Sequence, residues 1–250
     1  MNKEKDNLDE LLRVFNELRN LEWIFTSRKR TDGLLGNVFE DLIGKEEDNL
    51  SIADWRGIEL KTTRNSTSSL VTLFSKSPDH PKGANSYLRL NYGSLNEEHG
   101  LKVLNTTINA VSFNNHREGY SYKIGVDRVN KRLNLIIVES SSKKVLDDKV
   151  YWGFAVLEKA LKTKLKTIAI IYGDEKEEFG QTFVRFTKLK VINGLDMDSL
   201  LSALESGDLK IDIRIGVYSS GKNKGKTHDH GTGFRIHLTK LLDYSNVLET

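Results

Sequence analysis

The chain has 250 residues, of which 38% are hydrophobic and 29% charged, a profile typical of a soluble globular protein with one domain or two closely packed lobes. No apolar run is long enough to span a bilayer, no signal-peptide pattern begins the chain, and the lack of cysteine excludes disulfides and cysteine-based zinc sites, so we expect a cytoplasmic protein. The net charge of +3 is too small to indicate a nucleic-acid partner by itself.

Helix and strand patterns alternate along the chain without repeats or linkers. In the first third we predict an amphipathic helix capped by Asp6 or Asn7, a helix over 32–44, paired strands over 51–54 and 58–63, a strand over 70–74 and a loop over 76–85. In the rest we predict strands over 101–113, 120–129, 132–140 and 167–172, helices over 153–164, after Asp196 or Asp198, and over 240–244, and a hairpin over 210–220 and 232–238. This order predicts an α/β fold of the mixed α+β kind.

Charged residues interrupt one of the predicted strands, in the stretch ADWRGIELKTTR (53–64). Glu59 and Lys61 are two positions apart, so their side chains point to the same face of a strand, and Asp54 precedes them across a predicted turn. Charge inside a strand is costly. ELK is the only Glu-x-Lys tripeptide in the chain, although chance alone could produce one in a sequence of this composition.

Two carboxylates and an ammonium suit the hydrolysis of a phosphodiester, because that reaction needs a hard cation with oxygen ligands and positive charge near the transition state. We predict that Asp54 and Glu59 bind the cation and that Lys61 orients the attacking water or stabilises the developing charge. Glu40, at the rim of the apolar stripe of the preceding helix, is a candidate fourth member. An ordinary surface carboxylate is the alternative for Glu40.

The predicted terminal hairpin carries a second group of polar residues. Its basic, glycine-containing loop suits phosphate contacts, whereas arginine and histidine can donate to guanine and aspartate can accept from cytosine in a major groove. The candidate phosphate ligands are Lys222, Lys224 and Lys226, and the candidate base readers are Asp212, Arg214, His228, Asp229, His230 and Arg235. The alternatives are a transition-metal site on the His-x-His pair, for which the sequence offers no evident third ligand, and a solvated hairpin without a special role.

These residues carry a family resemblance. The order Glu40, Asp54, Glu59-x-Lys61 resembles the active site of PD-(D/E)XK nucleases of the MutH-like branch, and nearly the whole chain is similar to the MvaI/BcnI restriction endonucleases, closest to the MvaI side. The stretches that carry the likeness are FEDLIGKEEDNL (39–50), IELKT (58–62), LVTLFSKSP (70–78), KGANSYLR (82–89), VYW (150–152) and DIRIGVYSSGKNKGKTHDHGTGFRI (212–236). One departure is Ala53, which stands where the signature has proline, a residue that is not a metal ligand.

The resemblance implies a type II restriction endonuclease with a PD-(D/E)XK core and a second, DNA-recognition lobe. We expect the catalytic lobe mainly from about 1–100, on the minor-groove side of the DNA, and the recognition lobe mainly from about 101–240, on the major-groove side. The family likeness implies Mg²⁺ held by Asp54, Glu59 and the carbonyl of Leu60, and base reading by the hairpin residues named above.

The same resemblance implies a pseudosymmetric G·C-rich target of the CCNGG type, with CCWGG preferred, cut by a monomer that nicks the two strands in turn. A cognate DNA methyltransferase is the expected partner in such a system. Two alternatives remain. One is a MutH-like strand-nicking repair endonuclease that depends on partner proteins. The other is a sequence-specific DNA-binding protein with a decayed nuclease centre, against which the intact set of Asp54, Glu59 and Lys61 argues.

Overall fold

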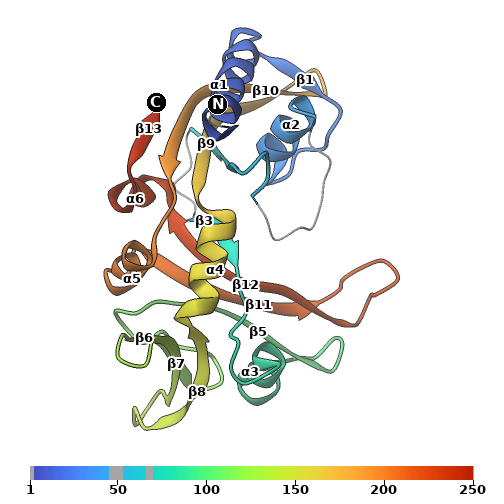
Figure 1. The fold of residues 1–250 in the computed structure, drawn as a ribbon. Coiled ribbons are helices and arrows are strands. Elements are labelled where there is room, and N and C mark those ends of the chain that lie inside the picture. Colours follow the sequence, from blue (N-terminus) through green and yellow to red (C-terminus); the bar gives the residue numbers. More distant parts are fainter. Residues whose placement is uncertain (1–2, 45–52, 66–69, 250) are drawn as a thin grey trace. The chain divides into compact units, whose positions relative to one another are not determined.

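The computed structural model describes residues 3–44, 53–65 and 70–249, and the chain divides into two compact units. Unit 1 consists of Met1–Ser69, Leu161–Leu195 and Ser245–Thr250, and unit 2 of Leu70–Ala160 and Asp196–Tyr244. This division differs from the expected one near residue 100, because unit 1 is assembled from three separate segments. In Figure 1 the chain passes from unit 2 into unit 1 through the helix α4 (Phe154–Lys164) and directly into strand β9 (Thr167–Glu178).

A parallel pair of strands explains why unit 1 is discontinuous. Strand β2 (Glu59–Arg64) runs parallel to β9, with Glu59 opposite Ile168 and Lys61 opposite Ile170. Parallel neighbours cannot be joined by a tight turn and need a long crossover connection. In this chain the connection contains the whole first segment of unit 2. The strand that carries the ELK motif is therefore paired with a strand that lies more than a hundred positions later in the sequence.

The sheet of unit 1 has the order β1–β10–β9–β2, and β13 pairs with β10. The remaining elements of unit 1 are α1 (Lys3–Asn20), β1 (Ile24–Thr26), α2 (Leu34–Leu42), β10 (Gln181–Asn193) and β13 (Val247–Glu249). Helix α1 includes Asp6 and Asn7, so neither residue is its cap as predicted. Asp6 lies in the first turn, where a negative charge interacts favourably with the positive end of the helix dipole. Among the described residues no helix has the length and apolarity needed to span a membrane.

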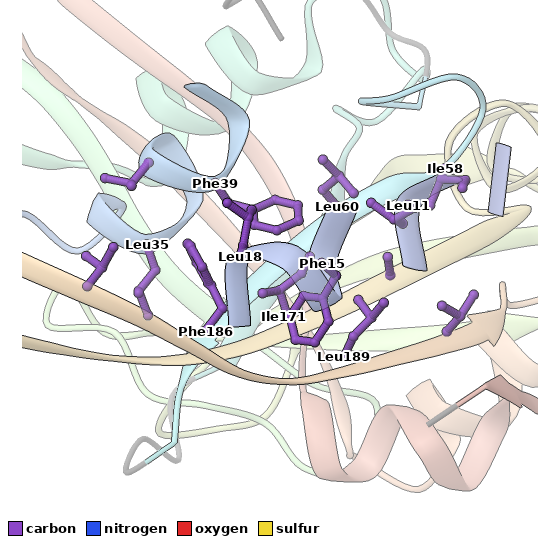
Figure 2. Packing of buried hydrophobic residues seen from close by; sticks show 14 of the residues in the cluster. Leu11, Phe15, Leu18, Leu35, Phe39, Ile58, Leu60, Ile171, Phe186 and Leu189 are labelled. Atoms are coloured by element: carbon purple, nitrogen blue, oxygen red, sulfur yellow. The ribbon is translucent and has the colours of Figure 1, made fainter. Parts of the chain in front are cut away.

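The core of unit 1 lies between the two N-terminal helices and one face of the sheet, as Figure 2 shows. Phe39 of α2 packs edge-on against Phe186 of β10, with ring centroids 5.2 Å apart. Ile58 and Leu60, at the start of β2, are buried in the same cluster. Because side chains alternate along a strand, the burial of Ile58 and Leu60 directs the intervening Glu59 to the other face.

Unit 2 contains two antiparallel sheets, of order β3–β12–β11–β5–β4 and β6–β7–β8. Its elements are β3 (Leu70–Ser75), α3 (Ala84–Tyr92), β4 (Ser94–Asn96), β5 (Leu101–Ile108), β6 (Tyr120–Asp127), β7 (Arg132–Glu139), β8 (Val145–Gly153), α5 (Met197–Glu205), β11 (Leu209–Val217), β12 (Thr227–His237), α6 (Leu238–Leu241) and the 3-10 helix η1 (Leu242–Tyr244). Asp196 caps α5 by accepting from Ser199 N at 2.7 Å, which confirms one of the two predicted caps. Helix α3 and strands β8 and β10 were not predicted.

Candidate active site and candidate base-reading hairpin

A tight turn brings Asp54 to the start of β2. Trp55 and Ile58 exchange both backbone hydrogen bonds, at 2.9 and 2.8 Å, and the two residues between them have φ values of 47° at Arg56 and 90° at Gly57. The left-handed conformation at the second position favours glycine, which has no Cβ to clash. The turn lets the backbone N of Leu60 donate to Asp54 Oδ2 at 3.1 Å. The expected turn is confirmed, while residues 51–52 of the expected first strand lie outside the described residues.

Glu59 is a buried carboxylate with unequal oxygens. Its exposed fraction is 1%. Oε1 accepts from Lys61 Nζ at 2.7 Å, whereas Oε2 is buried and has no hydrogen-bond partner in the described structure. Burial raises the pKa of Glu59, the ammonium of Lys61 lowers it, and the nearby carboxylate of Asp54 raises it further. A charge buried beside a like charge, with one oxygen unsatisfied, is costly unless a cation completes the site.

A second lysine lies next to Glu59. Lys164, the last residue of α4, has its Nζ 4.0 Å from Glu59 Oε1, the same oxygen that Lys61 contacts. Sequence reasoning missed this residue, because Lys164 is 105 positions from Glu59 and belongs to an ordinary-looking amphipathic helix. Only the return of the chain into unit 1, alongside β2, brings Lys164 to the motif.

Helix α2 packs closely against β2 and carries Glu40. A Cβ built on Gly36 would lie 3.0 Å from Thr62 Oγ1, so the backbone of the helix approaches the strand at this glycine. Glu40 is four positions after Gly36 and thus on the same face of the helix. Its half-buried side chain is consistent with the expected place beside the strand, but its part in a metal site stays a prediction.

The donor set of the catalytic strand fits a hard divalent cation. Asp54 and Glu59 supply carboxylate oxygens, the ligand type that Mg²⁺ prefers, and the unpartnered Oε2 of Glu59 is an oxygen for which the described protein provides no donor. Among the described residues no group of three His, Cys, Asp or Glu side chains is placed to hold a metal. Such a site would therefore rest on two carboxylates and a main-chain carbonyl, for which Leu60 stays the candidate.

The hairpin of β11 and β12 is interrupted by a bulge. Ile213 pairs with Thr232 and Ile215 with Asp229, so that two residues of β12, His230 and Gly231, lie opposite the single residue Arg214. Gly231 has a φ of 81°, the left-handed conformation that a bulge of this kind favours. Strand β12 begins at Thr227, so His228 and His230 lie on a strand and not in the predicted loop over 221–231.

Three rings are stacked on the hairpin. The Tyr218 and His228 rings are nearly parallel, with centroids 3.8 Å apart, and the His228 and His230 centroids are 3.6 Å apart. Burial lowers the pKa of His230, the neighbouring His228 and Arg214 lower it further, and Asp229 raises it. The lowered pKa favours the neutral imidazole of His230, in which one ring nitrogen donates and the other accepts. Tyr218 was not predicted, although an aromatic residue next to the basic loop was visible in the sequence.

Asp229 is turned away from the two histidines that flank it. It lies opposite Ile215, a residue of the buried face, and not opposite Gly216 as His228 does. Asp229 Oδ2 accepts from Asn85 Nδ2 and Oδ1 accepts from Gly231 N, at 2.9 and 2.8 Å. Both carboxylate oxygens thus fix the bulge. Asp229 lies near His230 but on the face of Ile215, and not on the face that carries Asp212 and Arg214.

Asp212 and Arg235 form an ion pair. Arg235 donates from Nη1 to Asp212 Oδ2 at 2.5 Å and from Nη2 to the carbonyl of Leu70 at 2.8 Å. Asp212 is buried, and both its Oδ1 and the Nε of Arg235 lack partners within the described structure. Arg214, whose Nε is also buried without a partner, lies on the neighbouring position of the same face. This face therefore holds unsatisfied polar atoms of the kind that a bound partner satisfies.

Three lysines occupy the loop between the two strands. Lys222, Lys224 and Lys226 are exposed, and none pairs with an acidic side chain of the described residues. Backbone hydrogen bonds order the turn, including Lys224 N to Gly221 O at 3.1 Å. The loop presents concentrated positive charge without internal compensation, as a phosphate-binding loop requires.

Comparison with known proteins decides the family. The family model of the MvaI/BcnI restriction endonucleases matches residues 12–243. The chain belongs to the MvaI/BcnI restriction endonuclease family. Among solved structures, the restriction endonuclease MvaI in complex with its cognate DNA substrate is 40% identical, with a TM-score of 0.89 and 97% of each chain covered. MvaI in the absence of DNA is 39% identical, with a TM-score of 0.64 and 96% of each chain covered. No curated protein sequence matches the chain.

Membership in the MvaI/BcnI family confirms the resemblance and the mixed α+β restriction-endonuclease fold that the motifs indicated. It also makes the chain a nuclease of the restriction type. Within this framework, the structure assembles Asp54, Glu59 and Lys61 as predicted and adds Lys164. The roles of the individual residues in metal binding and base reading stay predictions.

Proposed function

We propose that the protein is a Mg²⁺-dependent type II restriction endonuclease that hydrolyses DNA at a short pseudosymmetric site of the CCNGG type, with CCWGG preferred. The observation that supports this proposal most is the preassembled set of Asp54, Glu59 and Lys61 with the unpartnered oxygen of Glu59, in a chain that shares 40% identity with MvaI. A decayed centre would have no reason to retain a buried carboxylate with one oxygen that has no partner in the described structure.

In the proposed reaction, Asp54 and Glu59, with the carbonyl of Leu60, would hold Mg²⁺, and Glu40 would orient solvent or complete a second cation site. The cation would acidify a water and polarise the scissile phosphate. Lys61 orients the water for attack on phosphorus and stabilises negative charge on the phosphoryl oxygens. The new P–O bond forms to the water oxygen, the bond to the leaving sugar oxygen breaks, and that oxygen takes up a proton.

In the proposed recognition step, the loop lysines Lys222, Lys224 and Lys226 contact phosphates, while the face of the hairpin that carries Arg214, His228, His230 and Arg235 reads base edges in the major groove. Arginine is the commonest reader of guanine, which suits a G·C-rich target. The buried Asp212 orients Arg235 through their 2.5 Å hydrogen bond.

With one catalytic centre per chain, we propose that a monomer cuts the two strands in separate steps. The host's own sites would need protection, so a cognate DNA methyltransferase is the proposed partner. The test is digestion of a sequenced supercoiled plasmid by the pure protein with Mg²⁺, Ca²⁺ or chelator, followed by mapping of the ends. We expect a nicked intermediate before linear DNA, ends at CCWGG, and a rate that is first order in enzyme.

The other outcomes separate the alternatives. Direct conversion to linear DNA with second-order dependence on enzyme would indicate a dimer. Nicking that never proceeds to linear DNA without added proteins would indicate a partner-dependent repair endonuclease. Specific binding with no cleavage in any divalent cation would indicate a DNA-binding protein with an inactive centre. Ends at CCSGG would assign the other central base pair.

A further inference from the structure

The centre around Glu59 contains a lysine that the ELK motif does not account for. Lys164 approaches from the end of α4, an element separate from the turn and the strand that carry the other members. Its side chain is 27% exposed, against 19% for Lys61 and 1% for Glu59. Lys164 is therefore the most exposed of the three side chains, although it lies next to a buried carboxylate.

The two lysines share one oxygen of Glu59. Lys61 Nζ lies 2.7 Å and Lys164 Nζ 4.0 Å from Oε1, whereas Oε2 has no partner among the described residues. Both positive groups thus lie on one side of the carboxylate and leave the other oxygen available. A carboxylate free to rotate would exchange the two oxygens. The hydrogen bond from Lys61 fixes Oε1, and the charge of Lys164, at 4.0 Å from the same oxygen, favours the same orientation.

Lys164 is a second positive charge beside the buried carboxylate of Glu59, in addition to Lys61. If Lys61 turned from Glu59 toward a water or a phosphate, Glu59 would keep an unsatisfied charge in a buried position, which is strongly unfavourable. Lys164 supplies a second positive charge. Because it belongs to a different element, it can stay next to Glu59 when the side chain of Lys61 turns away.

We propose that Lys164 is a positioning residue of the catalytic centre, which holds Oε1 of Glu59 so that Oε2 stays available to the cation and Lys61 is released to act on the attacking water. This inference rests on the proposed function and deepens it. Lys164 acts through Glu59 and not on the DNA, so its loss affects the rate of cleavage and not the affinity for the site.

The experiment compares Lys164→Met, which removes the charge and keeps the length, with Lys164→Arg, which keeps the charge. Lys162→Met is the matched control, because Lys162 is an exposed lysine on the same helix. Single-turnover cleavage of a cognate duplex in Mg²⁺ should fall about 10- to 100-fold in Lys164→Met, as is typical when a group that orients a metal ligand is lost. Lys164→Arg should recover most of the rate, and Lys162→Met should cleave like the wild type.

A second readout needs neither metal nor cleavage. Melting temperatures of the metal-free protein are measured for Lys164→Met in the wild-type and in the Glu59→Gln background. If Lys164 compensates Glu59, its loss lowers the melting temperature of the wild type and has little effect once Glu59 is neutral. A general structural role would lower both equally. Cognate affinity in Ca²⁺ should be unchanged in Lys164→Met.

The outcomes distinguish this inference from the proposed function. If Lys61→Ala is inactive while Lys164→Met cleaves at the wild-type rate, the inference is overturned and the proposed function stands. Equal melting shifts in both Glu59 backgrounds would also overturn it. If the wild type does not cut any DNA, the proposed function fails, and the melting comparison alone decides whether Lys164 positions Glu59.

Discussion

The catalytic strand β2 and the hairpin β11–β12 both place charges among buried apolar residues, but they balance those charges in different ways. In the catalytic centre, a nearly inaccessible Glu59 is paired with Lys61 and approached by Lys164, so that most of the charge is compensated inside the protein. On the hairpin, the three loop lysines are exposed and lack acidic partners in the described structure. The first arrangement suits chemistry on a fixed geometry, and the second suits attraction of a polyanion.

This difference leads to a first prediction, with the largest expected effect. Lys61→Ala should reduce single-turnover cleavage in Mg²⁺ by orders of magnitude, because Lys61 acts on the reacting atoms, while cognate binding in Ca²⁺ stays within a few-fold of the wild type. Lys188→Ala, an exposed lysine on β10 of the same unit, is the charge-matched control. Cleavage by Lys61→Ala at the wild-type rate would remove the ELK motif from the active site.

Sequence reasoning located the catalytic strand because its signal is local. Asp54, Glu59 and Lys61 lie within eight residues, and strand alternation together with one turn is enough to place them. The strand over 167–172 was predicted, but its parallel pairing with β2 and the place of Lys164 were not, because a parallel neighbour is specified by the whole crossover and not by a short motif. The prediction therefore recovered the part of the centre that one stretch of chain encodes.

On the hairpin, the sequence reading named candidate residues but did not predict on which face of the hairpin each of them lies. Simple alternation would place His228 and His230 on one face and Asp229 on the other, yet the motif HDHG was treated as one cluster in a loop. The bulge at Gly231 was not predicted, and the hydrogen bond from Asn85 to Asp229 comes from a helix, α3, that the sequence reading missed. Strand β10 was missed although TFVRFTKLKVI alternates along much of its length. The bulge, the contact with Asn85 and strand β10 all depend on contacts between residues that are far apart in the sequence.

A second prediction tests the division between the hairpin's two faces. His228→Ala should cost about 1–3 kcal/mol of discrimination between the cognate duplex and a duplex with one base pair changed, because it removes a base-edge contact. Asp229→Ala should lower the melting temperature, since Gly231 N loses its acceptor and Asn85 Nδ2 keeps only its hydrogen bond to Ser77 Oγ. It should change discrimination less than His228→Ala does. Titrations in Ca²⁺ and thermal melts measure the two effects. The reverse order of effects would return Asp229 to the base readers.

Arg235 needs a more careful comparison, because it already has partners inside the protein. Arg235→Ala should bring cognate affinity close to the non-specific level, and it should also destabilise unit 2 by leaving the buried Asp212 without its cation. The double variant Arg235→Ala/Asp212→Ala should recover part of the stability without recovering specificity. If cognate and non-cognate affinity fall together in Arg235→Ala, the sequence is read elsewhere and the hairpin is a phosphate clamp.

A third prediction contrasts Glu59 with Asp147, a buried carboxylate of unit 2. Asp147 accepts hydrogen bonds from the Tyr87 hydroxyl, from Tyr92 Oη at 2.9 Å and from Lys149 N at 2.9 Å. Asp147→Ala should cost about 1–3 kcal/mol of unfolding free energy, because it leaves the half-buried hydroxyls of Tyr87 and Tyr92 without this acceptor. Glu59→Gln should cost less, because one Glu59 oxygen has no partner to lose in the described structure. Urea unfolding of both variants, without metal, gives the comparison.

The pH dependence of Asp147 follows from the same contacts. Burial alone would raise its pKa, but the hydrogen bonds from Tyr87, Lys149 N and Tyr92 outweigh burial and lower the pKa below its ordinary value of 3.8. The unfolded state therefore takes up the proton first as pH falls. This contribution to stability is fully present above about pH 4 and is lost as pH falls through the lowered folded value. In Asp147→Ala the acid limb of the stability curve should be shallower, and an unchanged limb would contradict this account.

The smallest predicted effect concerns the loop lysines, and it separates affinity from specificity. A phosphate contact is blind to sequence, so Lys224→Ala should weaken cognate and non-cognate binding by the same factor and lower the slope of log affinity against log salt by about one unit. Both duplexes are titrated over a range of salt concentrations, with Ca²⁺ in place of Mg²⁺ to prevent cleavage. Lys188→Ala on β10 again serves as the control for a lost surface charge, and its slope should not change. A reduced specificity ratio in Lys224→Ala, at an unchanged salt slope, would mean that the loop contacts bases. The exposed loop lysines would then contribute to base recognition as well as to the attraction of DNA. The hairpin would differ from the catalytic strand only in how exposed its charged side chains are.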